Sequence, residues 1–244
     1  MSVLCAKILL SHKIERFYIM PNWVFNDLSI EGNKEDIAKL KAQMNQPFTR
    51  VHEQWSFEKQ AMVTDETSYS NPVFAFWNII KPTDLEAYVK QPDHSLPLAE
   101  QLKFQTNDWY AWNVRNWGTK WDVANHDEDK YPETELYDEG DESLSYRFNT
   151  AWGPAKEAIL NLTEQYPNLN FTLSFEEETG WGGEWTFENG EYVTVSEYGW
   201  KCRECDHEED ETPWCDECEF DICPSCGYNE SSEACDKHKE DTNV

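Results

Sequence analysis

The residues in this chain that are best suited to chemistry are cysteines, because seven of its eight cysteines lie close together near the C-terminus. With one histidine they form four pairs, and each pair has two residues between its members. The pairs are Cys202 and Cys205, Cys215 and Cys218, Cys223 and Cys226, and Cys235 and His238. Two intervening residues allow a tight turn to aim both side chains at one tetrahedral ion, and four pairs supply the ligands of two closed sites. We therefore expect two structural Zn²⁺ ions.

Two other roles for these sulfur atoms remain open. Disulfide bonds would require an oxidising compartment, and the first residues of the chain lack a clear signal-peptide cleavage site. An iron–sulfur cluster would use cysteines at a different spacing. Metal binding also explains how so short a segment folds, because about forty residues hold too small a core to be stable alone. Thiolate ligands would contribute on the order of 10 kcal/mol per ion.

The charge of the chain limits its partners. Lys and Arg number 20 against 48 Asp and Glu, which gives a formal net charge of −28. Such a chain repels the phosphates of nucleic acids and the headgroups of anionic lipids, so we expect no direct binding to nucleic acid or to membranes. The partner that fits is a protein with a basic surface. A role of the charge in solubility alone is the other interpretation.

Acidic residues gather in one internal segment, 126–144, which we interpret as a solvated loop inserted in the body of the protein. The candidate partner-binding residues in it are Asp127, Glu128, Asp129, Asp138, Glu139, Asp141 and Glu142.

No apolar run in the chain approaches the ~20 residues that a transmembrane helix needs. The expected location is therefore the cytoplasm.

The larger body of the protein reads as an α+β domain. Apolar residues at helical spacing predict a helix over 34–43 and a second helix that begins at Gly153-Pro154. Asn189-Gly190 is typical of a tight hairpin turn. Alternating apolar residues predict strands over 23–30, 145–149, 168–175, 181–187 and 191–195. Runs of antiparallel strands with helices on one face define the α+β class.

No known catalytic motif stands out in residues 1–198, since the chain lacks a phosphate-binding loop, a nucleophile elbow and a zinc-protease signature. One hypothesis is nevertheless an enzyme of unknown reaction with a pocket on the aromatic segment. The candidate pocket residues are Trp117, Lys120, Trp121, Asp122 and Trp152. The other interpretation is an aromatic core, which the net charge favours over a base-stacking platform. The residues thus favour a binding protein over an enzyme.

Several motifs resemble the YubB ferredoxin-like domain family. They are Met20-Pro21-Asn22-Trp23, the run from Trp112 to Asp122, the run from Phe148 to Pro154, and Glu176 to Gly180. The resemblance implies a ferredoxin-like sheet over residues 20–198, preceded by an extension at residues 1–19. It also implies a phage or plasmid origin and no particular reaction. We therefore expect an acidic accessory protein that binds a host protein in the host cytoplasm. One form of this hypothesis is a nucleic-acid mimic that inhibits a host defence or DNA/RNA-handling enzyme.

Residues 199–244 resemble a ZZ-type zinc finger of the treble kind, on the run from Trp214 to Cys226. The resemblance implies that alternate pairs share an ion, so that Cys202, Cys205, Cys223 and Cys226 hold one ion and Cys215, Cys218, Cys235 and His238 hold the other. It further implies that Glu219 and Asp221 bind the free amine of another protein's N-terminus. A peptide-binding module is therefore a third functional hypothesis.

Overall fold

The computed structural model describes residues 22–56, 59–89, 108–125, 133–202, 207–209, 214–215, 220–221 and 225. The strands are β1 (Trp23–Gly32), β2 (Phe48–Ser56), β3 (Ala61–Tyr69), β4 (Glu135–Glu139), β5 (Ser143–Ala151), β6 (Leu169–Glu177), β7 (Gly182–Glu188), β8 (Glu191–Tyr198), β9 (Trp200–Lys201), β10 (Glu208–Glu209), β11 (Trp214–Cys215) and β12 (Phe220–Asp221). The helices are α1 (Lys34–Met44), the 3-10 helix η1 (Phe76–Asn78), α2 (Leu85–Val89), α4 (Trp109–Trp117) and α5 (Lys156–Gln165).

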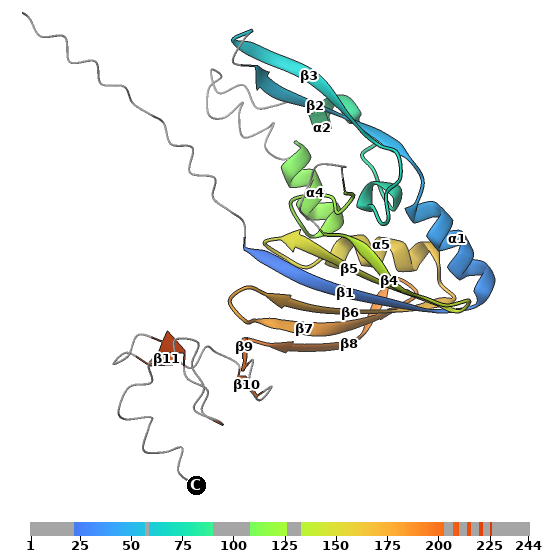
Figure 1. Cartoon of the computed structure of the whole chain (residues 1–244), viewed down its shortest axis with the longest axis vertical. Helices are drawn as coiled ribbons and strands as arrows, with labels where there is room; N and C mark the ends of the chain where they lie inside the picture. Colours follow the sequence, from blue (N-terminus) through green and yellow to red (C-terminus); the bar gives the residue numbers. More distant parts are fainter. Residues whose placement is uncertain are drawn as a thin grey trace, which may run out of the picture.

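The main sheet has six strands in the order β4-β5-β1-β6-β7-β8, and each strand is antiparallel to its neighbours (Figure 1). Strand β1 therefore lies between β5 and β6, which are parallel to each other and joined through α5. In the same way β5 lies between β1 and β4, and α1 belongs to the connection from β1 to β4. Two such split β-α-β units make a ferredoxin-like fold. The predicted α+β class and the antiparallel sheet are confirmed.

A long segment, 45–134, separates α1 from β4 and carries the β2–β3 hairpin, η1, α2 and α4. We call residues 45–134 the inserted segment. The hairpin stands away from the main sheet, and α4 lies between the two (Figure 1). The strand that follows this segment corrects one prediction. The acidic stretch was expected to be a loop, but residues Glu135–Glu139 form β4, which pairs with β5. Charged side chains are compatible with a strand here, because β4 is an edge strand of the main sheet.

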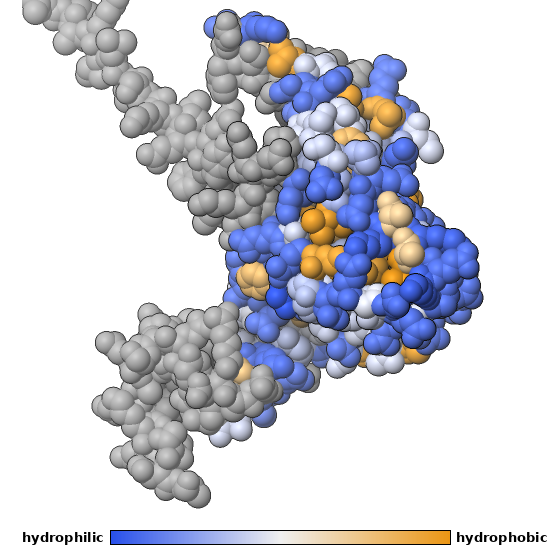
Figure 2. All heavy atoms as spheres, turned by 45° about the vertical axis from the view of Figure 1, so that its right-hand side comes forward, coloured by the Kyte–Doolittle hydropathy of each residue, from blue (hydrophilic) through white to orange (hydrophobic). Residues whose placement is uncertain are grey.

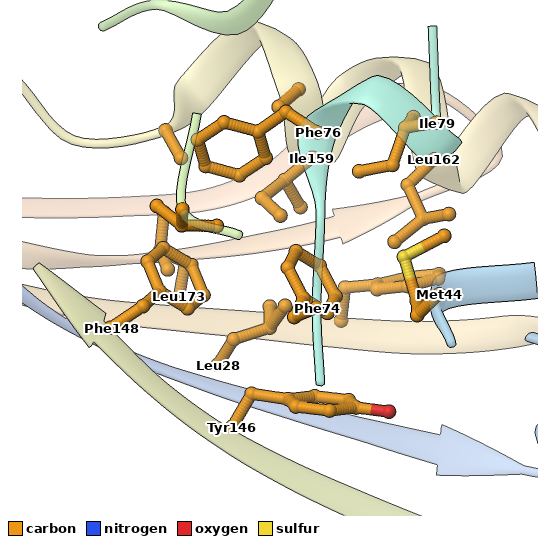
Figure 3. Close-up of a cluster of buried hydrophobic side chains, with 14 of the residues drawn as sticks. Leu28, Met44, Phe74, Phe76, Ile79, Tyr146, Phe148, Ile159, Leu162 and Leu173 are labelled. Atoms are coloured by element: carbon orange, nitrogen blue, oxygen red, sulfur yellow. The ribbon is translucent and has the colours of Figure 1, made fainter. Parts of the chain in front are cut away.

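The core lies between the main sheet and the helices. Alternate residues of β1, β5 and β6 point to the helical face, as the period of a strand requires. They pack against α1, α5 and the inserted segment (Figure 3). Fully buried members of this cluster include Leu28, Met44, Phe74, Phe76, Tyr146, Phe148, Ile159, Leu162 and Leu173. The inserted segment therefore contributes to the same core as the ferredoxin-like framework.

Local signals explain where the elements begin and end. The side chain of Asn33 accepts a hydrogen bond from the N–H of Asp36 and caps α1. Helix α4 begins after Asp108, which caps it in the same way, and ends at Gly118 in the left-handed conformation. Asn189 and Gly190 have φ of 53° and 80°, as a type I′ hairpin turn requires. The predicted helices and strands are thus found, with small changes at their ends.

The surface is mainly polar. In the face turned forward in Figure 2, hydrophilic residues predominate, and hydrophobic residues gather in a small central patch. Among the helices that the structure describes, none is long and apolar enough to cross a bilayer.

Candidate functional site

The face of the main sheet opposite α1 and α5 carries a groove of about 530 Å³. Because Val24 and Leu28 point into the core, the residues between them on β1 that point the other way are Phe25 and Asp27. Asp27 lies opposite Arg147 on β5, and Phe25 lies opposite Glu176 on β6. Side chains from five neighbouring strands therefore meet in this groove, and the β9–β10 hairpin borders one end of it through Lys201 and Glu208.

Carboxylates outnumber cationic groups in the groove. The acidic lining residues are Asp27, Glu176, Glu184 and Glu208, and the basic ones are Arg147 and Lys201. Both cations have carboxylate partners within the protein, because Arg147 lies 3.2 Å from Asp27 and Lys201 lies 3.8 Å from Glu208.

Two of the lining acids, Glu176 and Glu184, lie on the neighbouring strands β6 and β7. Glu184 accepts a hydrogen bond from the Ser174 hydroxyl at 3.0 Å. Within the part of the chain that the structure describes, neither Glu176 nor Glu184 forms an ion pair with a basic side chain. An aromatic surface lies beside Glu176, since Phe25 is 47% exposed and pairs with Glu176 across β1 and β6. The groove is thus a negatively charged surface with an exposed ring in it.

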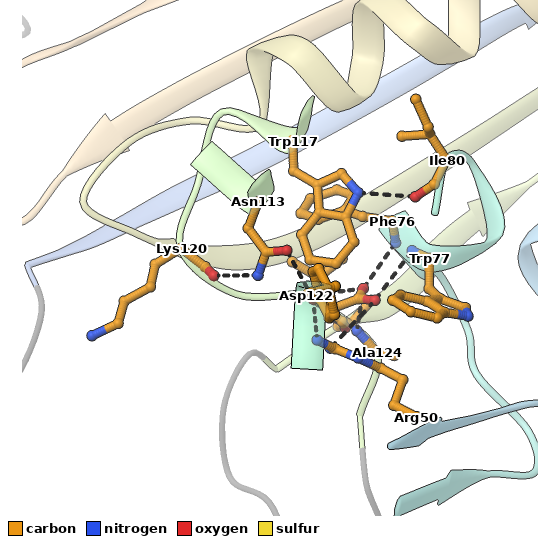
Figure 4. Close-up of polar contacts among 12 residues, drawn as sticks. Arg50, Phe76, Trp77, Ile80, Asn113, Trp117, Lys120, Asp122 and Ala124 are labelled. Atoms are coloured by element: carbon orange, nitrogen blue, oxygen red, sulfur yellow. Dashed lines mark hydrogen bonds and ion pairs between the residues drawn. The ribbon is translucent and has the colours of Figure 1, made fainter. Parts of the chain in front are cut away.

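Two of the five candidate pocket residues are structural (Figure 4). Trp117 is fully buried, and its indole N–H donates to the carbonyl of Ile80 at 3.2 Å. The Asp122 side chain is 3% exposed and accepts hydrogen bonds from the backbone N–H groups of Phe76, Trp77, Val123 and Ala124. Burial raises the pKa of the Asp122 carboxyl, and Arg50 and the backbone donors oppose that shift. These two side chains hold the inserted segment together and are not free to meet a substrate.

Arg50, which lies 3.9 Å from Asp122, begins a chain of hydrogen bonds through the inserted segment (Figure 4). Arg50 on β2 donates to the Tyr88 hydroxyl at 2.7 Å, and that hydroxyl donates to the Asn113 side chain at 2.9 Å. The amide of Asn113 in turn donates to the backbone carbonyl of Lys120. Burial raises the pKa of Tyr88, so the hydroxyl stays protonated. The network ties β2, α2 and α4 to the segment that follows α4.

The other three candidates lie together at the surface. The ammonium of Lys120 lies 4.5 Å from the ring centroid of Trp121 and 4.2 Å from that of Trp152. The edge of Tyr110 packs on Trp152 at 6.0 Å between ring centroids. The surrounding rings desolvate Lys120 and lower its pKa. Trp152 has a φ of 71°, and its N–H donates to the Asn22 carbonyl. Three of the four motifs of the YubB resemblance, those that contain Asn22, Lys120 and Trp152, thus meet at this surface.

The predicted partner-binding acids are only partly described. Asp127, Glu128, Asp129 and Glu219 lie outside the described residues, and the structure gives Asp221 only a backbone position in β12. Glu139 accepts from Lys41 at 2.6 Å and Asp141 from Lys34 at 2.9 Å, so both are paired with α1. Asp138 and Glu142 are exposed.

Of the predicted zinc ligands, Cys202 and Cys215 lie in the described residues, and Cys205, Cys218, Cys223, Cys226, Cys235 and His238 lie outside them. Cys202 is fully buried beside Trp200, and its N–H donates to the His207 carbonyl at 2.8 Å. Lys201 pairs with Glu208, so the first cysteine pair falls within a tight hairpin.

A second hairpin frames the next cysteine pair. Cys215 in β11 pairs with Phe220 in β12, so Cys218 falls within the connection. The predicted pairing, in which these two cysteine pairs belong to different ions, involves ligands outside the described residues. The first hairpin is also attached to the larger body, because the N–H of Lys201 donates to the carbonyl of Gly180.

Sequence reasoning did not find the groove residues or Arg50. The apolar alternation of β1 predicts which face of the strand is buried, and it assigns no role to the alternate positions Phe25 and Asp27. An exposed aromatic residue in a strand whose other face is already apolar was the available signal. Arg50 lies in a segment whose periodicity favours neither a helix nor a strand, so the sequence offered no comparable signal.

Comparisons with known proteins bear on the fold. A family model described as the ferredoxin-like domain in Api92-like protein matches residues 117–216. This part of the chain, which includes β4 to β8, is therefore similar to that ferredoxin-like domain. The matched range excludes β1, although β1 lies between two of its strands. The crystal structure of a protein api92 from Yersinia pseudotuberculosis is similar at 10% identity and a TM-score of 0.39, over 75% of this chain and 99% of that chain. The comparison with curated proteins finds no match.

Proposed function

We propose that this is an acidic accessory protein that binds a basic partner protein, and that the groove on the open sheet face is the contact surface. The single observation that carries the proposal is the groove itself. In it Glu176 lies opposite the exposed Phe25, Glu184 lies on the next strand, β7, and the groove's two basic side chains are paired with carboxylates. A cationic segment would neutralise the glutamates, and an apolar or aromatic side chain of the partner would cover the ring.

The charge of the whole chain supports a basic partner. A net charge of −28 attracts a cationic surface from beyond contact distance and accelerates association at low salt. Enzymes that handle DNA or RNA have such surfaces, because they bind phosphates through Lys and Arg. We propose that this protein competes for a surface of that kind. The YubB resemblance, with its phage or plasmid origin, makes a host enzyme in the host cytoplasm the proposed target.

Affinity purification from host lysate tests the proposal. The bait is the full chain, and the captured proteins are compared with those held by Glu176→Gln/Glu184→Gln. The control variant is Glu86→Gln/Glu164→Gln, which removes the same charge from exposed positions on α2 and α5. We expect one basic protein to be captured at low salt, to be released at high salt, and to be lost in the groove variant alone. Equal capture by both variants would contradict the role of the groove.

We propose in addition that the C-terminal segment binds two structural Zn²⁺ ions. The support is the two hairpins that enclose Cys202 and Cys215, together with the regular spacing of all eight donors. Elemental analysis of the purified protein should give two zinc atoms per chain. Cys202→Ser should reduce that number, whereas Cys5→Ser, outside the cluster, should leave it unchanged. Full thiol titration in denaturant without metal release would show that these cysteines do not hold zinc.

A further inference from the structure

A second cavity, of about 370 Å³, lies in the inserted segment, among the β2–β3 hairpin, α2 and α4. It shares no lining residue with the acidic groove. Its volume is in the range of pockets that hold small organic ligands, roughly 300–1,000 Å³. Its lining is mainly aromatic and basic, and the residues that matter here are Arg50, His52, Tyr69, Tyr88, Trp109 and Trp121.

Arg50 gives the cavity a cationic group whose N–H donors are not all used in hydrogen bonds to the described residues. A guanidinium has five N–H donors. The structure gives Arg50 one short hydrogen bond, to the Tyr88 hydroxyl, and a distance of 3.9 Å to Asp122. Its side chain is 20% exposed and lines the cavity. Among the described residues nothing else accepts a hydrogen bond from this guanidinium, so it can still receive an anionic oxygen.

The position of Arg50 is fixed in advance. Its Cζ atom lies 5.1 Å from the ring centroid of Trp77 and 5.6 Å from that of Trp117, so aromatic faces hold the guanidinium plane. The Tyr88 hydroxyl holds its other end. A binding group that is already ordered loses little conformational entropy when a ligand arrives. His52 projects from the same face of β2, two residues further along, and adds a second nitrogen donor.

The walls suit a planar group. Tyr69, Trp109 and Trp121 line the cavity, and Trp121 is 38% exposed, so one wall is open to solvent. A flat ring can stack on such side chains whatever its substituents. Glu53 is the acidic residue in the lining, in contrast to the acidic groove, where carboxylates predominate. The cavity thus combines a positive end with aromatic walls in a chain that is otherwise strongly negative.

We propose that this cavity binds a small planar anion, a ring that bears a phosphate or a carboxylate, with the anionic oxygens on Arg50 and the ring against Trp121. A nucleoside monophosphate and an aromatic carboxylate share this chemistry. Polymeric nucleic acid does not fit, because the −28 charge of the chain repels a polyanion. The site is separate from the partner-binding groove and does not depend on it.

Isothermal titration calorimetry of the full chain tests the site with two probes, adenosine 5′-monophosphate and indole-3-acetate. Adenosine and indole serve as the uncharged counterparts of these probes. We expect at least one anionic probe to bind, and to bind more tightly than its uncharged counterpart. Binding of the nucleotide alone identifies phosphate as the preferred anion, and binding of indole-3-acetate alone identifies carboxylate. Both results support the site, and binding of neither probe at millimolar concentration would overturn it.

Two variants locate the binding. Trp121→Leu should weaken the affinity about fivefold or more, because it removes a stacking surface. The matched control is Trp152→Leu, since Trp152 is similarly exposed and also contacts Lys120 but does not line the cavity. Arg50→Lys keeps a positive charge beside Asp122 and removes the planar fork, and it should also weaken the anionic probes. Equal weakening by Trp121→Leu and Trp152→Leu, or unchanged affinity in Trp121→Leu, would place the ligand elsewhere and refute the proposal.

Discussion

The guanidinium of Arg50 lies 3.9 Å from the carboxylate of Asp122, and this pair joins the inserted hairpin to the segment that follows α4. Both side chains are largely shielded from water, so each charge compensates the other in a region of low polarity. The backbone N–H groups of Phe76 and Trp77 donate to the same carboxylate. Asp122 therefore organises the inserted segment around one buried charge (Figure 4).

Removing that charge should destabilise the protein strongly. Asp122→Ala leaves Arg50 without its carboxylate partner and several backbone N–H groups without an acceptor, and we expect a loss of about 3–5 kcal/mol in the free energy of unfolding. Urea denaturation followed by circular dichroism measures it. Asp138→Ala, at an exposed position of β4, should change stability by less than about 0.5 kcal/mol. Similar effects of the two substitutions would show that the buried pair is not important for stability.

The Tyr146 hydroxyl should be dispensable for folding. It is buried in the core and has no hydrogen-bond partner among the described residues (Figure 3). Tyr146→Phe removes an unsatisfied polar group, so we expect unchanged stability or a gain of up to about 1 kcal/mol at neutral pH. A loss of more than that amount would reveal a hydrogen bond that the structure does not show. Tyr110→Phe, at an exposed ring, is the matched control.

The same tyrosine predicts a dependence of stability on alkaline pH. Burial raises the pKa of Tyr146 above its ordinary value of 10.0. The unfolded chain therefore ionises first, and the stabilisation, complete below pH 10, is lost as the pH rises from that value through the raised folded-state pKa. Denaturation curves at a series of pH values should show this decline in the wild type. The decline should be shallower in Tyr146→Phe, and identical slopes would contradict the assignment.

Gly118 should not tolerate a side chain. It ends α4 with a φ of 82°, and a Cβ at this position would lie 3.0 Å from the Pro154 carbonyl oxygen and 3.1 Å from the Lys156 nitrogen. Gly118→Ala should cost about 1–3 kcal/mol of stability, because neighbouring backbone cannot move aside cheaply. Thermal denaturation measures the change. Gly140→Ala is a milder control, since the nearest obstacle there is the Ser143 hydroxyl, which can rotate away.

Lys120 should titrate below the ordinary lysine value of 10.5, because the surrounding rings desolvate its ammonium group. The folded state therefore favours the charged form less than the unfolded chain does, and this penalty on folding disappears as the pH rises from the lowered pKa to 10.5. An NMR titration of the lysine side chains measures the value directly. Trp152→Ala opens the site to water and should move the pKa of Lys120 back toward 10.5. No movement in that variant would show that the ring does not cause the shift.

The framework of the fold could be predicted because its elements have regular patterns. Ile37, Leu40 and Met44 recur at helical spacing in α1, and Asn189-Gly190 marks a hairpin turn by its backbone requirement. Such signals are local, so tertiary contacts do not override them. Strand β4 was missed for the opposite reason. Its residues are almost all exposed at the edge of the sheet, and they lack the apolar alternation that reveals a strand.

The candidate sites were less accessible to sequence reasoning. The groove depends on the register between β1, β5 and β6, which brings Asp27, Arg147 and Ser174 together from distant parts of the chain. The cavity near Arg50 depends on how the inserted hairpin folds back over α2 and α4. No local sequence pattern predicts either of these two arrangements. The cysteine pairs are different, because two ligands of one ion must be close in sequence to share a turn.

Strand β1 is synthesised before both of its neighbours in the sheet, β5 and β6. Val24 pairs with Thr150 on one side and with Glu177 on the other, so both neighbours of this central strand are synthesised long after it. Pairing over such sequence separations slows folding. During translation, β1 has neither β5 nor β6 to pair with while the inserted segment is synthesised. We expect nascent chains to need chaperones, and chains truncated before β6 to aggregate, because half of the central strand's backbone groups would still be unpaired.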